Sequence, residues 1–576
     1  MKNSIKYLLS LFLVLSLIIS QSSFALQALQ EGDQRFYPVE AAHGMVASQE
    51  AIASQIGADI LKQGGNAVDA AVAVGFALAV TLPKAGNIGG GGFMVIWLNK
   101  EKKAIAINYR EKAPMGASKE MYLDKDGNVD RHLVSGTYLA SGVPGTVKGL
   151  VYAEKTYGKL GLEKVMAPAI KLAEDGFVVS YPFAQSLTEA KQRLESSKES
   201  MKIFFKANGA AYEPGDIFKQ PELAKSLKLI AKTDGKAFYE GKIAKAIAKD
   251  MKKNGGLITL KDLKDYNIEI MQPVKGDYNG YTIYSMPPPS SGGVILIEIL
   301  NILKHFPLNQ YGLNSAKSIN TLVEAMNYAY NDRNSDLGDP DFVKMDLAKL
   351  TSSKYADQIA KKITPEKHTP AIDIATTKPQ DLESNQTTQF SIADKDGNMV
   401  SNTYTLNYSY GSGIVAKGTG ILLNNEMDDF TAKVGVPNVY GLIQGEANSI
   451  APGKRPLSSM TPTIILDPKG NPYMATGTPG GARIITTTLQ VILNVLEYQL
   501  NLQSAVNMPR IHSQLWPEEI RIEQGISPDT IGLLEKMGNK VTLLPAMGAA
   551  ESVMIKDGKY YGAADPRRPG GLAVGY

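Results

Sequence analysis

The chain has 576 residues, of which 44% are hydrophobic and 20% are charged, and its formal net charge at pH 7 is only +4. This length predicts two domains or one large layered domain, and the small net charge gives no basis for nucleic-acid binding. Cysteine is absent, which excludes disulfides, thiolate nucleophiles and cysteine-ligated zinc, and the five histidines lack metal-ligand spacing, so we expect neither a metal nor a cofactor.

The first 25 residues have the pattern of a signal peptide. Two lysines precede an apolar stretch from Tyr7 to Ile19, and Ser23 and Ala25 place small residues before a cleavage point after Ala25. A retained membrane anchor is the alternative, but the apolar stretch is short for a span. We therefore expect an exported protein, periplasmic or secreted, without a stable membrane anchor.

Two helices and a glycine-rich strand are predicted next. Apolar positions between residues 48 and 62 recur at helical spacing and end at two glycines. Residues 66–83 are apolar nearly all round, which indicates a buried helix capped by Asn66. Four consecutive glycines, residues 89–92, then enter a strand. They do not match a nucleotide-binding motif, so we interpret them as a site of close backbone packing.

The order of elements indicates a layered fold. Residues 160–350 are mostly helical in pattern with charged faces, and "MPPPSSGGVILIEILNIL" predicts a proline turn that opens a buried helix. Residues 364–386 are polar and without periodicity, which is typical of a flexible linker. Strand patterns dominate after that point. Helices followed by strands favour a fold in which sheets and helices form separate layers.

The segment "ESNQTTQFSIADKDGNMVSNTYTLN", residues 383–407, predicts a β-hairpin. A two-residue turn at Asp396-Gly397 would mix polar and apolar side chains on each face. A three-residue turn at 395–397, with its glycine in the left-handed conformation, separates them. In that register one face carries Phe390, Ile392, Val400, Tyr404 and Leu406, and the other carries Thr387, Gln389, Ser391, Ser401, Thr403, Thr405 and Asn407.

This register places Thr405 across from Thr387, with Asn407 diagonal to it. A polar strand face usually meets solvent, which is the simplest interpretation. A threonine is also a nucleophile when its own α-amine acts as the base, and this requires cleavage of the peptide bond before it. An α-amine has a pKa of about 7.7, which suits a general base. Such chemistry needs no histidine, cysteine or metal.

Several long motifs in this chain closely resemble those of the γ-glutamyltranspeptidases. They are "NYREKAP", "NQTTQFSIADKDGNMVSNTYTLN", "GILLNNEMDDF", "KRPLSSMTPTI" and "GTPGGARI", and the likeness runs from about residue 37 to Tyr576. The resemblance implies an N-terminal-nucleophile hydrolase of α+β class with a four-layer αββα sandwich. It also implies a precursor that cleaves itself between Gln386 and Thr387, into associated subunits of residues 26–386 and 387–576. The linker then ends at the cleavage site.

The resemblance also implies roles for residues that bear on the chemistry. Thr387 would be the nucleophile of both maturation and turnover, and Thr405 would orient it. Gly480 and Gly481 would donate backbone N–H groups to an oxyanion hole, where glycine allows close approach.

A pocket for the γ-glutamyl head group follows from the same resemblance. Arg110, Ser458 and Ser459 would bind the α-carboxylate, since a guanidinium recognises a carboxylate at two points. The α-ammonium would be held by Asn407, Glu426 and Asp429. Tyr440 would belong to a lid loop over the pocket that excludes water.

The expected activity is that of a γ-glutamyltransferase and glutathione hydrolase. Its substrates would be glutathione and other γ-glutamyl compounds, with amino acids, peptides or water as acceptors. The nearest alternative is an amide acylase of the same fold that acts on glutaryl-type side chains, which would leave the acids Glu426 and Asp429 without an ammonium to bind. A periplasmic solute-binding protein is an alternative of another class.

Overall fold

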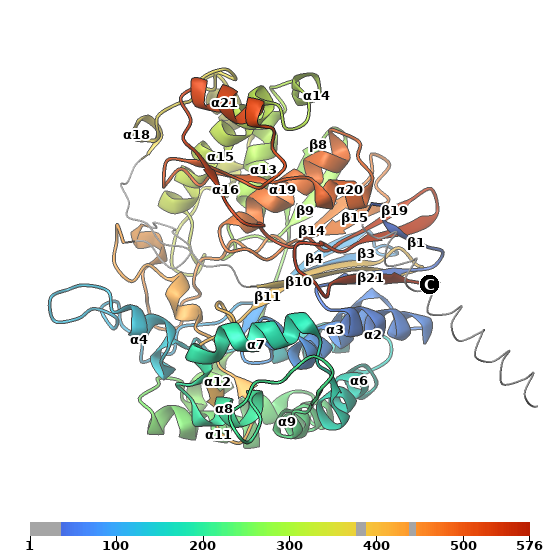
Figure 1. Cartoon of the computed structure of the whole chain (residues 1–576), viewed down its shortest axis with the longest axis vertical. Helices are drawn as coiled ribbons and strands as arrows, with labels where there is room; N and C mark the ends of the chain where they lie inside the picture. The colour runs from blue at the N-terminus through green and yellow to red at the C-terminus, as the bar shows by residue number, and fades with distance from the viewer. Residues whose placement is uncertain (1–35, 376–386, 437–444) are drawn as a thin grey trace, which may run out of the picture.

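The computed structural model describes residues 36–375, 387–436 and 445–576. In this part of the chain two seven-stranded sheets lie face to face between two layers of helices (Figure 1). The predicted four-layer αββα sandwich is therefore confirmed. The signal peptide, Gln386 and Tyr440, on which predictions were made, lie outside the described residues.

One sheet, the hairpin sheet, has the strand order β21-β2-β10-β11-β3-β4-β7. Its strands are Leu572–Gly575 (β21), Met45–Ser48 (β2), Thr388–Ala393 (β10), Met399–Thr405 (β11), Gly91–Leu98 (β3), Lys103–Tyr109 (β4) and Glu269–Met271 (β7). The second sheet has the order β1-β20-β19-β15-β14-β9-β8. Its strands are Val39–Ala41 (β1), Lys559–Ala563 (β20), Ser552–Lys556 (β19), Pro472–Thr476 (β15), Thr463–Leu466 (β14), Tyr281–Ser285 (β9) and Val274–Tyr278 (β8). Neighbouring strands in both sheets are antiparallel.

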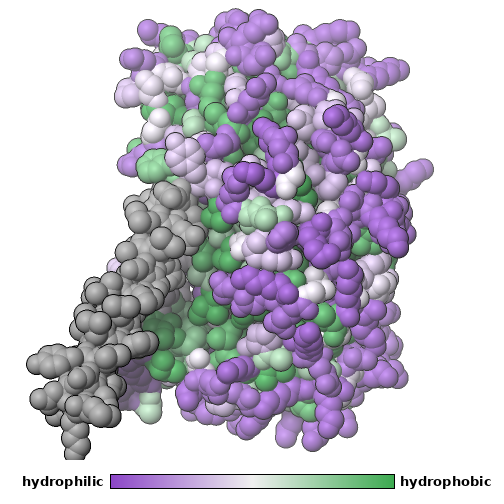
Figure 2. Space-filling view, turned by 90° about the vertical axis from the view of Figure 1, so that its right-hand side faces the viewer, coloured by the Kyte–Doolittle hydropathy of each residue, from purple (hydrophilic) through white to green (hydrophobic). Residues whose placement is uncertain are grey.

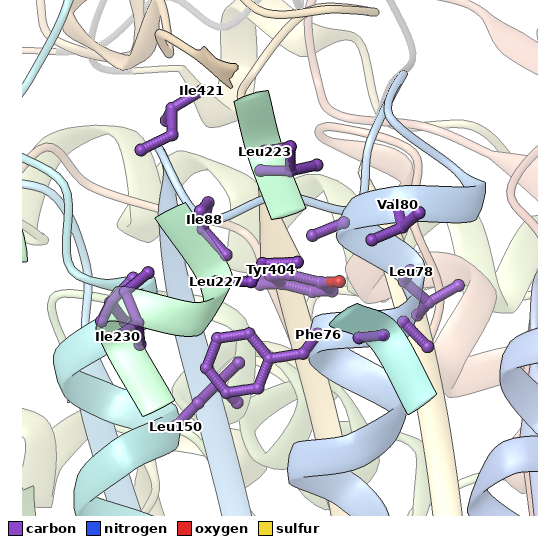
Figure 3. Close-up of a cluster of buried hydrophobic side chains, with 14 of the residues drawn as sticks. Phe76, Leu78, Val80, Ile88, Leu150, Leu223, Leu227, Ile230, Tyr404 and Ile421 are labelled. Carbon is purple, nitrogen blue, oxygen red and sulfur yellow. The ribbon is translucent and has the colours of Figure 1, made fainter. Parts of the chain in front are cut away.

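The first helical layer covers the outer face of the hairpin sheet (Figure 1). It consists of α2 (Ala51–Lys62), α3 (Ala67–Thr81), α5 (Thr146–Tyr157), α6 (Leu162–Asp175), α7 (Tyr181–Leu194), α8 (Lys198–Phe204), α9 (Pro221–Lys232), α10 (Lys236–Tyr239), α11 (Lys242–Lys253) and α12 (Leu260–Asp265). Every residue of α3 is buried, and the side chain of Asn66 caps it by accepting the N–H groups of Val68 and Asp69, as predicted. Figure 3 shows how Tyr404 of β11 points into this layer beside Phe76 of α3 and Leu227 of α9.

The second helical layer covers the other sheet. It consists of α13 (Gly292–Leu303), α14 (Leu308–Tyr311), α15 (Ala316–Asp336), α16 (Leu347–Leu350), α17 (Ser353–Ala360), α18 (Ala371–Ile374), α19 (Arg483–Leu496), α20 (Leu502–Asn507) and α21 (Pro528–Lys536). The helix α13 is buried throughout and follows a proline turn, as predicted. In Figure 2 the visible surface is mostly hydrophilic, with hydrophobic side chains showing between the polar ones.

Several short elements lie between these helices and strands. They are α4 (Arg131–Ser135), the 3-10 turns η1 (Tyr138–Ala140), η2 (Glu426–Asp429) and η3 (Glu446–Asn448), and the strands β5 (Phe177–Val178), β6 (Ile217–Phe218), β12 (Val415–Ala416), β13 (Ile421–Leu422), β16 (Ile511–His512), β17 (Ile520–Ile522) and β18 (Val541–Leu543). Within the described ranges, no helix combines the length and the hydrophobicity that a bilayer crossing requires.

The hairpin β10–β11 has the predicted register. Gln389 pairs with Thr403 and Ser391 with Ser401. Gly397 adopts a φ of +80° in a three-residue turn and its N–H donates to the carbonyl of Asp394. The simplest interpretation of the sequence was that the polar face meets solvent, and the structure shows that it does not. It is buried against the second sheet, where Ser391 Oγ donates to the carbonyl of Glu551 at 2.7 Å.

The predicted linker begins with packed residues. His368 lies between the carboxylates of Glu324 and Glu518, at 3.1 and 3.0 Å. Ala371 and Ile374 of α18 are buried in the second helical layer. The start of the linker is held in place because His368 contacts two carboxylates and because Ala371 and Ile374 pack into the second helical layer. Residues 376–386 lie outside the described part of the chain.

Candidate active site

Thr387 and Thr405 lie together at the end of the hairpin, and both are buried. The Oγ1 of Thr387 donates to the Oγ1 of Thr405 at 3.4 Å, which is a long hydrogen bond. The N–H of Asn407 donates to that same Thr405 oxygen at 2.8 Å. Arg568 Nη1 donates to the backbone carbonyl of Thr387 at 3.2 Å. The predicted proximity of Thr387, Thr405 and Asn407 is therefore present.

The glycine run at 89–92 explains how Thr405 reaches this position. Gly91 of β3 pairs with Thr405, and a Cβ atom at Gly90 would overlap the carbonyl oxygen of Thr405. That carbonyl accepts a hydrogen bond from Asn87 Nδ2 at 2.9 Å. The expected close backbone packing is present, and it positions the end of β11.

A cavity opens beside the two threonines. It is lined by Arg110, Arg333, Thr387, Thr405, Glu426, Asp429, Leu457, Ser458, Ser459, Met460, Gly481 and Ile484. Most of the predicted site residues are in this set, although their segments are far apart in the chain. Asn407 and Gly480 adjoin lining residues without lining the cavity themselves.

Gly480 and Gly481 lie just before α19, with φ values of 137° and 58°. Within the described residues, the N–H of neither glycine donates a hydrogen bond. A left-handed backbone favours glycine, and N–H groups at the start of a helix suit an anion. The segment thus has the donors that an oxyanion hole requires.

Arg110 follows β4 and is fully buried. It forms ion pairs with Glu426 and Asp429 of η2, and its Nη1 lies 3.6 Å from Glu111. Burial alone would lower the pKa of Arg110, but these carboxylates outweigh it and hold that pKa above its ordinary value. The side chain predicted to bind a substrate carboxylate thus contacts the two acids that were predicted to hold the ammonium.

Two acids in this cluster, Glu111 and Glu426, have raised pKa values. Burial raises the pKa of Glu111 to about 7, with Arg110 opposing the shift and Asp429 adding to it. Burial also raises the pKa of Glu426 well above its ordinary value, again against the attraction of Arg110. Both oxygens of Glu111 are buried without a hydrogen-bond partner in the described structure. Three acids therefore surround one guanidinium.

Ser458 and Ser459 lie on the segment that leads into β14. Ser458 Oγ accepts the N–H of Met460 at 3.1 Å. Ser459 Oγ accepts a hydrogen bond from Arg333 Nη2 at 2.9 Å. Both hydroxyls border the cavity, as the predicted carboxylate contacts should.

Arg333 and Glu111 were missed by sequence reasoning. Arg333 lies near the end of α15, in the polar run "NYAYNDRNSD", where nothing separates a buried arginine from a solvated one. Glu111 adjoins Arg110 in "NYREKAP" and could have been noticed for that reason alone. No cluster of His, Asp and Glu suited to a metal ion occurs among the residues that the structure describes.

Residues 53–575 match the family described as Gamma-glutamyltranspeptidase. The chain is 52% identical over 542 residues to the "Glutathione hydrolase proenzyme" of Escherichia coli (strain K12), covering 94% of this chain and 93% of that protein.

Two solved structures share the fold. Cephalosporin acylase from Bacillus halodurans has a TM-score of 0.82 at 29% identity, covering 94% of this chain and 97% of that chain. The gamma-glutamyltranspeptidase of Helicobacter pylori has a TM-score of 0.55 at 49% identity, covering 56% of this chain and 92% of that chain.

Proposed function

The chain belongs to the gamma-glutamyltranspeptidase family, and from this premise we propose that Thr387 is the nucleophile of its reaction. The activity is that of an autoprocessed γ-glutamyltransferase and glutathione hydrolase. The observation that carries the choice of nucleophile is the buried contact of Thr387 Oγ1 with Thr405 Oγ1, at the wall of a cavity that also holds charges of both signs.

Maturation would use the same hydroxyl as turnover. Thr387 Oγ1 attacks the carbonyl carbon of Gln386, and the acyl group moves from nitrogen to oxygen, which breaks the C–N bond and frees the α-amine. Water then hydrolyses the ester, which releases the Gln386 carboxylate and restores the Thr387 hydroxyl. The products are a large subunit of residues 26–386 and a small subunit of residues 387–576. The hydrogen bond to Thr405 supports this role, because it fixes the direction of the attacking oxygen.

In turnover Thr387 Oγ1 attacks the γ-carbonyl of glutathione or another γ-glutamyl compound, with the freed α-amine as general base. The C–N bond to the leaving amine breaks and an acyl-enzyme remains. An amino acid, a peptide or water then takes the γ-glutamyl group. The N–H groups of Gly480 and Gly481 would hold the oxyanion of each tetrahedral intermediate.

The head-group pocket would combine both signs of charge. Glu426 and Asp429, together with Asn407, would hold the substrate α-ammonium. Ser458 and Ser459 would donate to the α-carboxylate, beside Arg110. A glutaryl amide lacks the ammonium, so the buried acids disfavour the acylase alternative. The solute-binding alternative is set aside because the chain belongs to an enzyme family.

The setting of the enzyme is a further part of the proposal. Residues 1–25 would be removed as a signal peptide, which leaves an exported protein that is periplasmic or secreted. Tyr440 would be the aromatic residue of a lid.

Replacing Thr387 by alanine tests the nucleophile. The purified Thr387→Ala variant should run as a single uncut chain on a denaturing gel and release no p-nitroaniline from γ-glutamyl-p-nitroanilide, because both steps need the hydroxyl. Sequencing the wild-type small subunit should give Thr-Thr-Gln-Phe. Two fragments of the correct size from the alanine variant would refute the assignment.

A further inference from the structure

We propose that Arg568 keeps the freed α-amine of Thr387 unprotonated at neutral pH, so that the amine can serve as the general base. This inference deepens the proposed function and rests on it. Arg568 would touch neither the substrate nor the reacting atoms, because it acts through the main chain of Thr387. It is therefore a positioning residue, whose charge sets the protonation of a neighbouring group.

The contacts of Arg568 place its guanidinium close to the α-nitrogen. Arg568 lies in the loop between β20 and β21, and its Nη1 donates to the carbonyl oxygen of Thr387 at 3.2 Å. The α-nitrogen and the carbonyl carbon of Thr387 are bonded to the same Cα atom, so Nη1 lies no more than about 7 Å from the amine. A cation at this range disfavours the protonated amine, and a general base must be unprotonated.

Arg568 carries its positive charge at neutral pH. Burial lowers its pKa to about 10, with Asp565 opposing the shift. Asp565 does not cancel this charge by itself, because it also forms ion pairs with Arg510 at 2.5 Å and with Arg567 at 3.2 Å. Burial raises the pKa of Glu551 well above its ordinary value, so this second acid stays neutral. An excess of positive charge remains beside Thr387.

The helix α19 adds to this excess. Arg483, at its start, lies close enough to Arg568 to lower the pKa of Arg568 further. Burial lowers the pKa of Arg483 itself to about 10, with Glu523 opposing the shift. Glu523 forms an ion pair with Arg567 at 2.6 Å, so its negative charge is already engaged.

The charges on the side of the substrate cavity nearly balance. They belong to Arg110, Arg333, Glu111, Glu426 and Asp429. Two arginines face three acids, and the pKa values of Glu111 and Glu426 are raised, so part of the acid charge is neutralised below about pH 7. The acids therefore offset the arginines there, and the loop that carries Arg568 decides the net charge at the amine.

A second cavity, of about 240 Å³, gives access to Arg568 from the side away from the substrate. Gln49, Glu50, Lys84 and Arg568 are among its lining residues. Gln49 Oε1 lies 3.5 Å from Arg568 Nη1. Burial lowers the pKa of Lys84 to about 8, and repulsion by Arg568 adds to the shift. Lys84 Nζ forms no ion pair or hydrogen bond with any residue that the structure describes, so its replacement breaks no polar contact. Glu50 caps α2, and burial raises its pKa.

Two added carboxylates test the charge of Arg568 without removing it. Gln49→Glu and Lys84→Glu each bring a negative charge towards the guanidinium, so the amine should hold its proton more strongly. We would measure kcat for saturating γ-glutamyl-p-nitroanilide from pH 5 to 9, since kcat reports groups in the enzyme–substrate complex. The rise of kcat with pH should move upwards by about half to one pH unit. kcat should fall about three- to tenfold on the acid side and approach the wild-type value at pH 9.

Replacement of Arg568 and two control variants complete the comparison. Arg568→Gln should move the rise of kcat upwards by about one pH unit, and Arg568→Lys should restore most of the wild-type profile because lysine keeps the charge. Gln310→Glu and Lys225→Glu are the matched controls, since they make the same changes at exposed sites. Both should leave the profile unchanged.

Inhibition by L-glutamate separates the amine from the acids of the substrate cavity. Its pH dependence reports the charge of Glu111 and Glu426, which attract the ammonium of the ligand. Gln49→Glu and Lys84→Glu should leave this pH dependence as in the wild type while they shift the profile of kcat. A change in both profiles together would assign the shift to the acids and would contradict the inference.

Each remaining outcome also decides the question. A loss of kcat by the same factor at every pH, or an unchanged profile in both carboxylate variants, would overturn the role of Arg568. Maturation is checked first on a denaturing gel, and if Arg568→Gln stays uncut, Gln49→Glu and Lys84→Glu decide. Failure of both to mature would count against the inference, because the amine does not exist before the cut. A wild-type enzyme that fails to cleave γ-glutamyl-p-nitroanilide would instead refute the proposed function.

Discussion

At the scale of single residues, the charge of the pocket depends on two interacting acids, Glu111 and Glu426. Glu111 lies under Arg110, close to Glu426 and Asp429, and its carboxylate is fully buried. Burial raises the pKa of Glu111 to about 7 and raises that of Glu426 still more clearly. The two acids interact, so any titration near neutral pH belongs to the pair. Substrate binding should respond to it.

A pH series on Glu111→Gln tests this coupling. Below about pH 7 the pair Glu111 and Glu426 holds a proton, and above it the pair gains a negative charge. That charge attracts the α-ammonium of L-glutamate. L-glutamate should therefore inhibit the wild type more strongly as pH rises through about 7. In Glu111→Gln the rise in inhibition should occur at lower pH, because Glu426 ionises more easily without a neighbouring acid. The inhibition constant is measured from pH 5 to 9. If inhibition rises at the same pH in Glu111→Gln as in the wild type, the coupling is contradicted. Glu213→Gln, a change at an exposed site, serves as control.

At the scale of elements, the glycines at the start of β3 and just before it position the site, because they have no side chains. Gly90, Gly91 and Gly92 each approach the backbone of β11 or of β4 more closely than a Cβ atom would permit. The end of β11 is therefore held at Thr405 by a neighbouring main chain and by Asn87. The position of the Thr405 hydroxyl depends on that contact, because two residues further the chain turns at Asn407 with φ of 76°.

Gly90→Ala should displace the end of β11. The new methyl group would meet the carbonyl of Thr405 and the side chain of Asn87, so self-cleavage should slow at least tenfold and the folded state should lose about 1–3 kcal/mol. Cleavage is followed on denaturing gels and stability by thermal melting. The control is Gly532→Ala in α21, where a Cβ would meet nothing within 4 Å. Equal behaviour of the two variants would show that the contact at Gly90 is unimportant.

At the scale of the whole molecule, the proposed cut leaves both pieces with strands in each seven-stranded sheet. In the hairpin sheet β10, β11 and β21 come from one piece, and β2, β3, β4 and β7 come from the other. In the second sheet β14, β15, β19 and β20 come from the small piece and β1, β8 and β9 from the large one. Neither piece contains all the strands of either seven-stranded sheet.

The cleaved protein should therefore migrate as one species on size exclusion under native conditions and split only in denaturant. Separation would expose strand edges and the apolar faces of both sheets, which is strongly unfavourable. Light scattering of the mature protein gives the mass. Two native peaks at the masses of the separate pieces would be inconsistent with sheets that contain strands from both pieces.

The stability of the whole molecule should also depend on Glu298, which α13 buries close to Asp332 of α15. Burial raises its pKa well above the ordinary value, with Asp332 adding to the shift, so it stays protonated in the folded state. The unfolded chain releases that proton above about pH 4.5, so the contribution of Glu298 to wild-type stability falls as pH rises from there, by up to about 1.4 kcal/mol per pH unit.

Glu298→Gln removes this dependence. Its melting temperature should match or approach that of the wild type near pH 4.5 and exceed it increasingly towards pH 8. Thermal melts across that range measure the gap, with the exposed Glu213→Gln as control. A gap that stays constant with pH would show that Glu298 does not hold its proton.

Local pattern sufficed for much of the fold. Side-chain alternation predicted the register of β10 and β11, and a nearly all-apolar run after Asn66 predicted the capped, buried helix. Both depend on residues close in sequence. Solvent exposure of the polar hairpin face, the alternative that the sequence left open, does not occur. Alternation separates two faces, but it does not reveal that a second sheet covers one of them.

The sequence by itself therefore determined the elements, their pairing at the hairpin and, through long ordered motifs, the family and the polar groups of the site. Only the tertiary structure decided which charges meet. Glu426 is 316 residues from Arg110, and Ser459 is 126 residues from Arg333. No local periodicity relates such positions. Their contacts arise because the two sheets and the helix α15 converge on one cavity. Burial strengthens the electrostatic interactions between charges there.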